Sequence, residues 1–194
     1  QAKLSRARKE MERAGADTMI VTALDEIAWL LNIRGSDVSY NPVTLAYLLL
    51  DTVAIHMFVE EKKLSPEAKK HLRALGVTVR AYGEVTEALG SLPTGRKLLI
   101  DSGRLNAALL RALPEQIGRV HASSPITPMK ARKNASQAAG IREAMRRDGA
   151  ALVSFFVWLE KEIAQGRKHR EKEVSEVIRE RRAARELFVS EAFN

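Results

Sequence analysis

Short apolar runs alternate with helical patterns over the first 125 residues, and this alternation restricts the possible folds more than any other feature. Runs of strand length and composition lie at 17–22, 44–51, 52–59, 77–82, 97–101 and 119–123. Helical patterns lie before or between them, at 3–15, 25–33, 65–76, 84–89 and 105–113. Such alternation favours an α/β fold in which helices flank one sheet. Because two of the runs are nearly contiguous around Asp51, we expect an antiparallel hairpin within a mixed β-sheet.

The helix predicted at 65–76 has clear signals at both ends. Ser65 stands at the N-cap position, where a hydroxyl can accept a hydrogen bond from a free backbone N–H. Pro66 occupies the first helical position, and Gly76 follows the last turn, as is typical of helix ends. The sequence therefore predicts where this helix begins and ends.

The pattern changes after residue 125. Residues 123–134 hold two prolines and three basic residues without periodicity, and 126–134 is predicted to be a linker. Two helices are predicted after it, at 136–165 and 171–187, and the apolar face of the first consists of Ile141, Met145, Leu152, Phe155, Leu159 and Ile163. Because two such helices bury little of their apolar faces, we expect them to begin an incomplete second domain. The predicted organisation is an interdomain helix at 1–16, an α/β domain at 17–125, the linker at 126–134 and the second domain at 135–194.

Composition narrows the class of protein. Of the 194 residues 45% are hydrophobic, which is enough to build a core, and no cysteine is present. Disulfides and cysteine-bound zinc are thereby excluded, and a cytoplasmic location is favoured. The basic residues that give the formal charge of +8 are interleaved with acidic residues along the chain. Specific nucleic-acid binding is therefore not expected. No apolar run approaches the roughly 20 residues that span a bilayer, so no membrane partner is expected.

The stretch from Asp25 to Gly35 allows two interpretations. Asp25, Glu26 and Arg34 could form one edge of an active site. Alternatively, the two acids open a short helix at its positively polarised end, and the residues that pack against the sheet are Ile27, Leu30 and Leu31. Because no partners for the acids are evident elsewhere in the chain, the structural interpretation is favoured.

The four histidines are His56, His71, His121 and His169, and none has a metal-binding spacing. We expect His56 to lie partly buried in a strand, whereas His71 and His169 stand among basic residues and are expected on the solvated surface. No carboxylate adjoins His121. The histidines therefore predict no metal site.

Two further segments could bind a ligand. Asp101 and Ser102 follow a strand and could contact one, but capping a helix that begins near Leu105 is the favoured role. The basic run at 130–133 could hold an anion, although such runs are typical of solvated linkers. The residues considered one by one assemble no active site.

A family resemblance adds what single residues do not provide. The stretch VTALDEIAWLLNIRGSDVSYNPV, Val21–Val43, resembles a signature of the cytosolic three-domain Xaa-Pro aminopeptidases, or aminopeptidase P family. In the same order, Leu98–Pro114 is similar to the late strand and helix of that family's second domain. Ser123–Ile163 and Arg170–Asn194 are similar to the entry into its third domain. The resemblance covers nearly the whole chain.

The resemblance implies a creatinase/prolidase N-terminal-like, ribonuclease H-like α/β domain, followed by the first two helices of a truncated α+β pita-bread domain. It implies that the parent protein removes the N-terminal residue from peptides with proline in second position. In that family two divalent metals, usually manganese, sit on two Asp, one His and two Glu, and the enzyme is often a homodimer through the catalytic domain.

None of those ligands is found in this chain, so the resemblance carries no catalytic or metal-binding residue onto it, and we expect the chain by itself to bind no metal and to be inactive. Phe193 is the one residue associated with the substrate pocket, as part of its wall. The alternative function is a non-catalytic pita-bread interaction module that resembles a histone-chaperone subunit.

Overall fold

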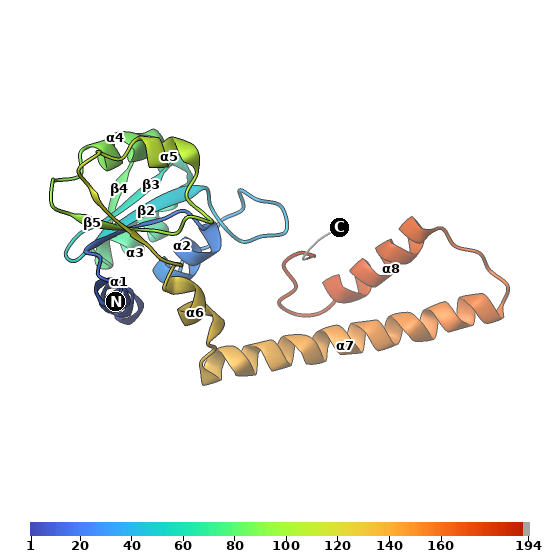
Figure 1. The fold of residues 1–194 in the computed structure, drawn as a ribbon. Helices are drawn as coiled ribbons and strands as arrows, with labels where there is room; N and C mark the ends of the chain where they lie inside the picture. Colours follow the sequence, from blue (N-terminus) through green and yellow to red (C-terminus); the bar gives the residue numbers. More distant parts are fainter. Residues whose placement is uncertain (192–194) are drawn as a thin grey trace. The chain divides into compact units, whose positions relative to one another are not determined.

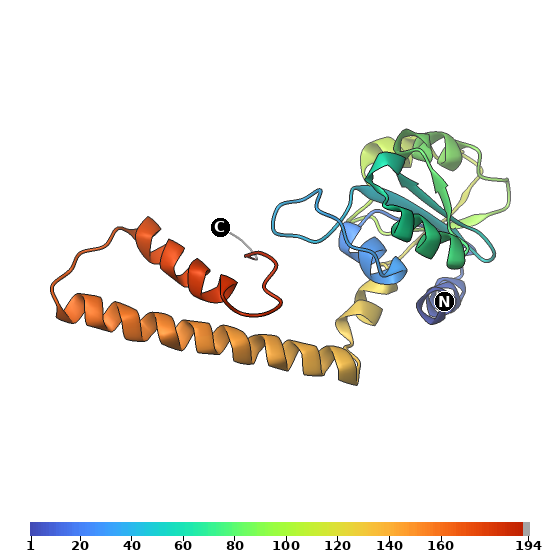
Figure 2. The same ribbon diagram turned by 180° about the vertical axis from the view of Figure 1, so that it is seen from behind.

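The computed structural model describes residues 1–191 and divides into two compact units, Gln1–Ala131 and Arg132–Asn194. Each unit is described by itself. Figure 1 and Figure 2 show opposite sides of the ribbon. The domain boundaries expected from the sequence remain predictions.

Unit 1 is built on one six-stranded sheet in the order β4-β3-β2-β1-β5-β6. The strands are β1 Thr18–Val21, β2 Ala46–Asp51, β3 Ile55–Val59, β4 Thr78–Arg80, β5 Lys97–Ile100 and β6 Gly118–His121. Strand β2 runs antiparallel to both β1 and β3, whereas β1, β5 and β6 are parallel to one another. The expected α/β fold with a mixed sheet and a β2–β3 hairpin is therefore confirmed.

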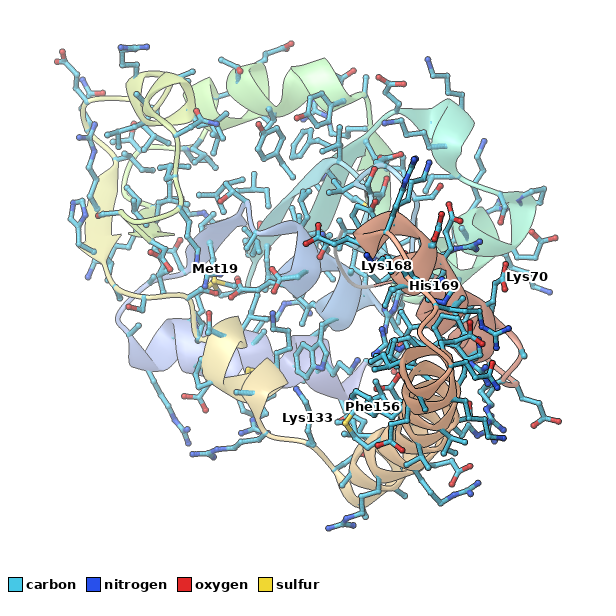
Figure 3. All side chains as sticks on the ribbon, turned by 90° about the vertical axis from the view of Figure 1, so that its right-hand side faces the viewer. Met19, Lys70, Lys133, Phe156, Lys168 and His169 are labelled. Atoms are coloured by element: carbon cyan, nitrogen blue, oxygen red, sulfur yellow. The ribbon has the colours of Figure 1, made fainter. Side chains whose placement is uncertain are left out.

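Helices cover both faces of this sheet, as Figure 1 shows. The helices of unit 1 are α1 Ala2–Arg13, α2 Leu24–Leu31, α3 Pro66–Ala74, α4 Val85–Gly90, α5 Ala107–Arg111 and α6 Ile126–Ala131, with 3-10 turns at Glu61–Lys63 and Tyr82–Glu84. Apolar residues of α1, α2, α3 and α6 form one core cluster with alternate strand residues such as Met19, which lies inside the unit (Figure 3). Residues of α4 and α5 form a second cluster on the opposite face.

Alternation along the strands explains this two-sided core. Leu48 and Leu50 of β2 belong to the first cluster, whereas Leu49 between them belongs to the second. Successive side chains of a strand point to opposite faces, so a continuous apolar run is what a sheet covered on both faces requires. The consecutive leucines Leu48–Leu50 are therefore all apolar because both faces of β2 are buried there.

Unit 2 consists of the 30-residue helix α7, Ala135–Ala164, and of α8, Glu171–Ala183. Asn134 caps α7 by accepting a hydrogen bond from the backbone N–H of Gln137, whose side chain accepts one from the N–H of Asn134. Phe155 is buried, whereas Ile141, Met145 and Ile163 of the predicted apolar face are exposed. The expected pair of helices is confirmed, but the expected face of α7 is only partly covered among the described residues.

Three local predictions were wrong. Residues 126–131 of the predicted linker form α6, because Ile126 and Met129 are buried in the core of unit 1. Asn106, and neither Asp101 nor Ser102, caps α5 by accepting a hydrogen bond from the N–H of Leu109. Helix α8 ends at Ala183, short of the expected end at Leu187, which adopts a positive φ of 63°.

Candidate functional site

Glu26 is the most unusual ionisable residue of unit 1. It lies in the first turn of α2, which begins three residues after β1, and none of its surface is exposed to solvent. A buried carboxylate is costly unless hydrogen-bond donors surround it. The structure therefore raises the question of what this side chain contacts.

Three side chains from distant parts of the sequence donate to Glu26. Arg104 Nη1 lies 2.6 Å from Oε1, and Ser124 Oγ lies 2.6 Å from Oε2. Thr127 Oγ1 also donates to Oε1. The sequence-based view that the acids of 25–35 lack partners was wrong, because these partners lie 78 to 101 residues away and no local pattern marks them.

Asp101 extends this cluster, which we call the Glu26 cluster and define as Glu26, Asp101, Arg104, Ser124 and Thr127. The Asp101 carboxylate accepts a hydrogen bond from the backbone N–H of Ser124 at 2.9 Å and lies 3.6 Å from Arg104 Nε. A cavity of about 10 Å³ lies beside the cluster. That volume is close to the minimum for one water molecule, so it admits no peptide substrate.

Asp25, the second acid, pairs with Lys130 of α6. Both acids in the first turn of α2 thus bind residues in or directly before α6. Carboxylates at a helix N-terminus are favoured by the helix dipole, as the sequence suggests. Their partners show that they also join two helices.

The opposite end of α2 is surrounded by basic side chains. Lys3 Nζ donates to the carbonyl of Trp29 at 2.7 Å and lies 4.5 Å from its ring centre, and Arg34 Nη1 donates to the carbonyl of Ile33 at 2.7 Å. Burial, and secondly the nearby Arg34 charge, lower the pKa of Lys3. Cations satisfy the carbonyls that a helix end leaves open. Arg34 therefore has a structural partner and lies at the other end of the helix from Glu26.

The loop after α2 is held by Asp37. Its carboxylate accepts hydrogen bonds from the N–H of Leu45 at 2.7 Å, from Thr44 Oγ1 at 2.8 Å and from Lys63 Nζ at 3.0 Å. These donors, the Leu45 N–H above all, lower the pKa of Asp37. A Cβ on Gly35 would lie 2.8 Å from Thr44 Cβ, so only glycine fits this close approach.

The histidines are scattered. His71 Nε2 is 2.8 Å from the carbonyl of Leu31, so it is not simply a solvated residue as expected. His121 Nδ1 is 2.9 Å from Ser102 Oγ, and His56 is partly buried in β3 as expected. His169 is exposed as expected, and its Nε2 also lies 2.9 Å from Glu162 Oε2 in unit 2.

Glu162 of α7 contacts His169 in the connection to α8, and His169 Nδ1 lies 3.6 Å from Glu173 Oε2 of α8. Figure 3 labels Lys168 and His169 in the connection from α7 to α8. Burial alone would raise the pKa of Glu162, but hydrogen bonds from His169 and Arg167 outweigh it and lower that pKa. The arrangement is one carboxylate with two basic partners.

Residues 1–191 contain no group of three or more His, Asp and Glu side chains that could hold a metal ion. These residues therefore do not fit a dinuclear metal centre, and we derive no metal-dependent step for them. None of their helices is long and apolar enough to cross a membrane. Phe193, the expected pocket-wall residue, lies outside the described residues.

Known proteins resemble this chain over nearly its whole length. Xaa-Pro aminopeptidase 1 of Dictyostelium discoideum is 38% identical over 99% of the chain and 31% of its own length. The crystal structure of X-prolyl aminopeptidase from Caenorhabditis elegans, described as a cytosolic enzyme with a di-nuclear active site, matches with a TM-score of 0.92 and 30% identity over 99% of the chain and 32% of that structure. An Xaa-Pro dipeptidase from Bacillus anthracis, at a TM-score of 0.68 and 18% identity, shares the fold.

The chain spans about a third of the length of the curated relatives that it matches. The model of one family, described as the Creatinase/Prolidase N-terminal domain, matches residues 1–137, which include the sheet, the Glu26 cluster and all six helices of unit 1. That match covers more than half of the chain. The chain thus belongs to the Creatinase/Prolidase N-terminal domain family, and its relatives are named Xaa-Pro aminopeptidases.

Proposed function

We propose that the whole protein is a metal-dependent aminopeptidase that removes the N-terminal residue from peptides with proline in second position. The observation that carries this proposal is the match of 99% of the chain to an X-prolyl aminopeptidase at 30% identity and a TM-score of 0.92. At that level of similarity the likeness extends beyond the fold to the sequence, and relatives from other organisms carry names of the same activity.

In this proposal the described residues support catalysis without performing it. Two metal ions, manganese in our proposal, bind ligands in other parts of the whole protein, because residues 1–191 provide no suitable group. The di-nuclear active site of the structural relative supports the number of metals. Such a pair activates a bridging water and polarises the scissile carbonyl.

Other parts of the proposal rest on the family. Helices α7 and α8 begin a pita-bread catalytic domain, the enzyme is a homodimer through that domain, and it is cytoplasmic. Phe193 is proposed to line the pocket wall for the N-terminal residue. The present chain by itself is proposed to be inactive.

The test compares the whole protein with residues 1–194. After chelation, each is supplied with Mn²⁺ and offered an Xaa-Pro-Pro peptide and a matched Xaa-Ala-Pro peptide. We expect only the whole protein to release the N-terminal residue, only from the first peptide, and only after metal is restored. Cleavage by residues 1–194 would contradict the assignment of catalysis to other parts. An inactive whole protein that still folds would favour a non-catalytic interaction module.

A further inference from the structure

Two sequence segments that carry the family resemblance meet in the structure. The first, Val21–Val43, contains Asp25 and Glu26, and the second, which begins at Ser123, contains Ser124, Thr127 and Lys130. Glu26 contacts Ser124 98 residues away and Thr127 101 residues away.

The spacing within the second segment explains how α6 is held. Ser124, Thr127 and Lys130 recur every three residues and contact the two acids of α2. Ile126 and Met129, which lie between these polar residues in the sequence, are buried in the core. Ser124 Oγ also accepts a hydrogen bond from the N–H of Ile126 at 3.3 Å, at the start of α6. This short helix is thus bound to α2 through polar contacts and to the core through apolar ones.

We propose that Glu26 is a positioning residue, which locks the short helix α6 against α2 at the C-terminal end of unit 1. Helix α6 ends at Ala131, and unit 2 begins at Arg132. A helix of six residues is too short to be stable by itself, so its place depends on these contacts.

The chemistry explains why a carboxylate is needed at this position. Arg104, Ser124 and Thr127 all donate, and an ionised carboxylate can accept from all of them through its two oxygens. A glutamine has one acceptor oxygen and an NH₂ group that faces at least one donor. An apolar residue would leave the hydroxyls of Ser124 and Thr127 without this acceptor, and Arg104 would keep only its contact with Asp101.

Hydrogen exchange on residues 1–194 tests the lock without any assumption about activity. We compare Glu26→Gln, Thr127→Val and Ser124→Ala with Glu87→Gln, which replaces an exposed glutamate on α4. Loss of one hydrogen bond to a charged group should raise exchange of the α6 amides about tenfold, while amides of β1 and β5 stay protected. Thr127→Val keeps the volume and most of the fold, so it remains informative if Glu26→Gln unfolds. Unchanged α6 exchange in both Thr127→Val and Ser124→Ala, or equal acceleration throughout unit 1, would overturn the proposal.

A kinetic test in the whole enzyme rests on the proposed function. A loose α6 lowers the fraction of molecules in which α6 is docked on α2. In this proposal substrate binds that state and so restores it. We therefore expect Thr127→Val to raise KM about three- to tenfold with kcat nearly unchanged, and Glu26→Asp to restore part of what Glu26→Gln loses. A merely structural role would lower kcat, through loss of active enzyme, with KM unchanged. An inactive wild type would refute the proposed function and leave the exchange result to decide on Glu26.

Discussion

The two units use their apolar residues differently. In unit 1, the helices cover both faces of a sheet, and large side chains such as Phe58 and Leu48 are fully buried. In unit 2, α7 packs mainly against α8, and large apolar side chains remain exposed at Ile141, Met145, Val153, Phe156, Val157 and Ile163. A hollow of about 790 Å³, lined by Met145, Leu187 and Phe188 among others, lies between α7 and the segment after α8.

The difference between the units shows that a sequence can form a long helix without burying the apolar side chains of that helix. Helix α7 has a strong cap and 30 residues of helix, yet a second helix covers only a stripe of its surface. A sheet offers two broad faces, so short helices such as α4 become part of a core when they lie on it. Unit 1 therefore has a core of its own, whereas unit 2 buries few of its apolar side chains among the described residues.

Replacing a phenylalanine in each unit should give the largest contrast. Phe58→Ala removes a ring that is 0% exposed in β3, whereas Phe156→Ala removes one that is 54% exposed on α7. We expect the free energy of unfolding to fall by about 3–5 kcal/mol for Phe58→Ala and by less than about 1 kcal/mol for Phe156→Ala. Chemical denaturation followed by fluorescence can separate the units in variants that keep a single tryptophan, because Trp29 lies in unit 1 and Trp158 in unit 2. Equal losses would mean that α7 is packed as tightly as the sheet.

Glu162 offers the next contrast, because its charge holds the turn of unit 2. Its pKa in the folded chain is below the usual value, so its stabilising contribution is fully present above about pH 4.5 and is lost as the pH falls through the lowered pKa. Trp158, whose ring centre lies 5.1 Å from that of His169, should report this loss in an acid titration. Glu162→Gln should remove the transition from the Trp158 signal and leave Trp29 unaffected.

Loss of a helix cap should have a moderate effect in both units. Ser65 caps α3 and Asn134 caps α7, and replacing either by alanine should cost about 1 kcal/mol. The Ser65→Ala loss should appear in the cooperative unfolding of unit 1. If the two units unfold independently, the Asn134→Ala loss should appear only in the Trp158 signal. A loss that both tryptophans report would show that the units unfold together.

The smallest effect on stability is expected at Glu143. Arg146 and then Arg147 donate hydrogen bonds to its carboxylate and lower its pKa to about 2. Carboxyl NMR should therefore find this group ionised down to about pH 2, while Arg146→Ala should move its titration toward 4.5. The pair is exposed, so the melting temperature at neutral pH should barely change. A normal pKa in the unchanged chain would contradict the arginine contacts.

Much of the fold could be predicted from local sequence. Strands β1, β2 and β5 are continuous apolar runs, and Ser65 with Pro66 marks the start of α3, because these signals act within a few residues of chain. Helix α6 was missed because its periodicity spans only six residues and two prolines precede its middle. The cap of α5 was misplaced by a few residues because Asp101, Ser102 and Asn106 are all good capping types.

The sequence by itself determined the α/β class, the mixed sheet, the pair of long helices and the family, since each depends on local periodicity or on ordered resemblance along the chain. Only the tertiary structure decided the role of Glu26. On the sequence it is one of two acids at a helix start, and its exposure cannot be read from that position. Its burial depends on Arg104, Ser124 and Thr127, which reach it only after β5 and β6 pair beside β1 and bring the start of α6 next to α2. Hydrogen bonds and ion pairs between residues so far apart are set by the folded sheet, and for that reason no local pattern predicts them.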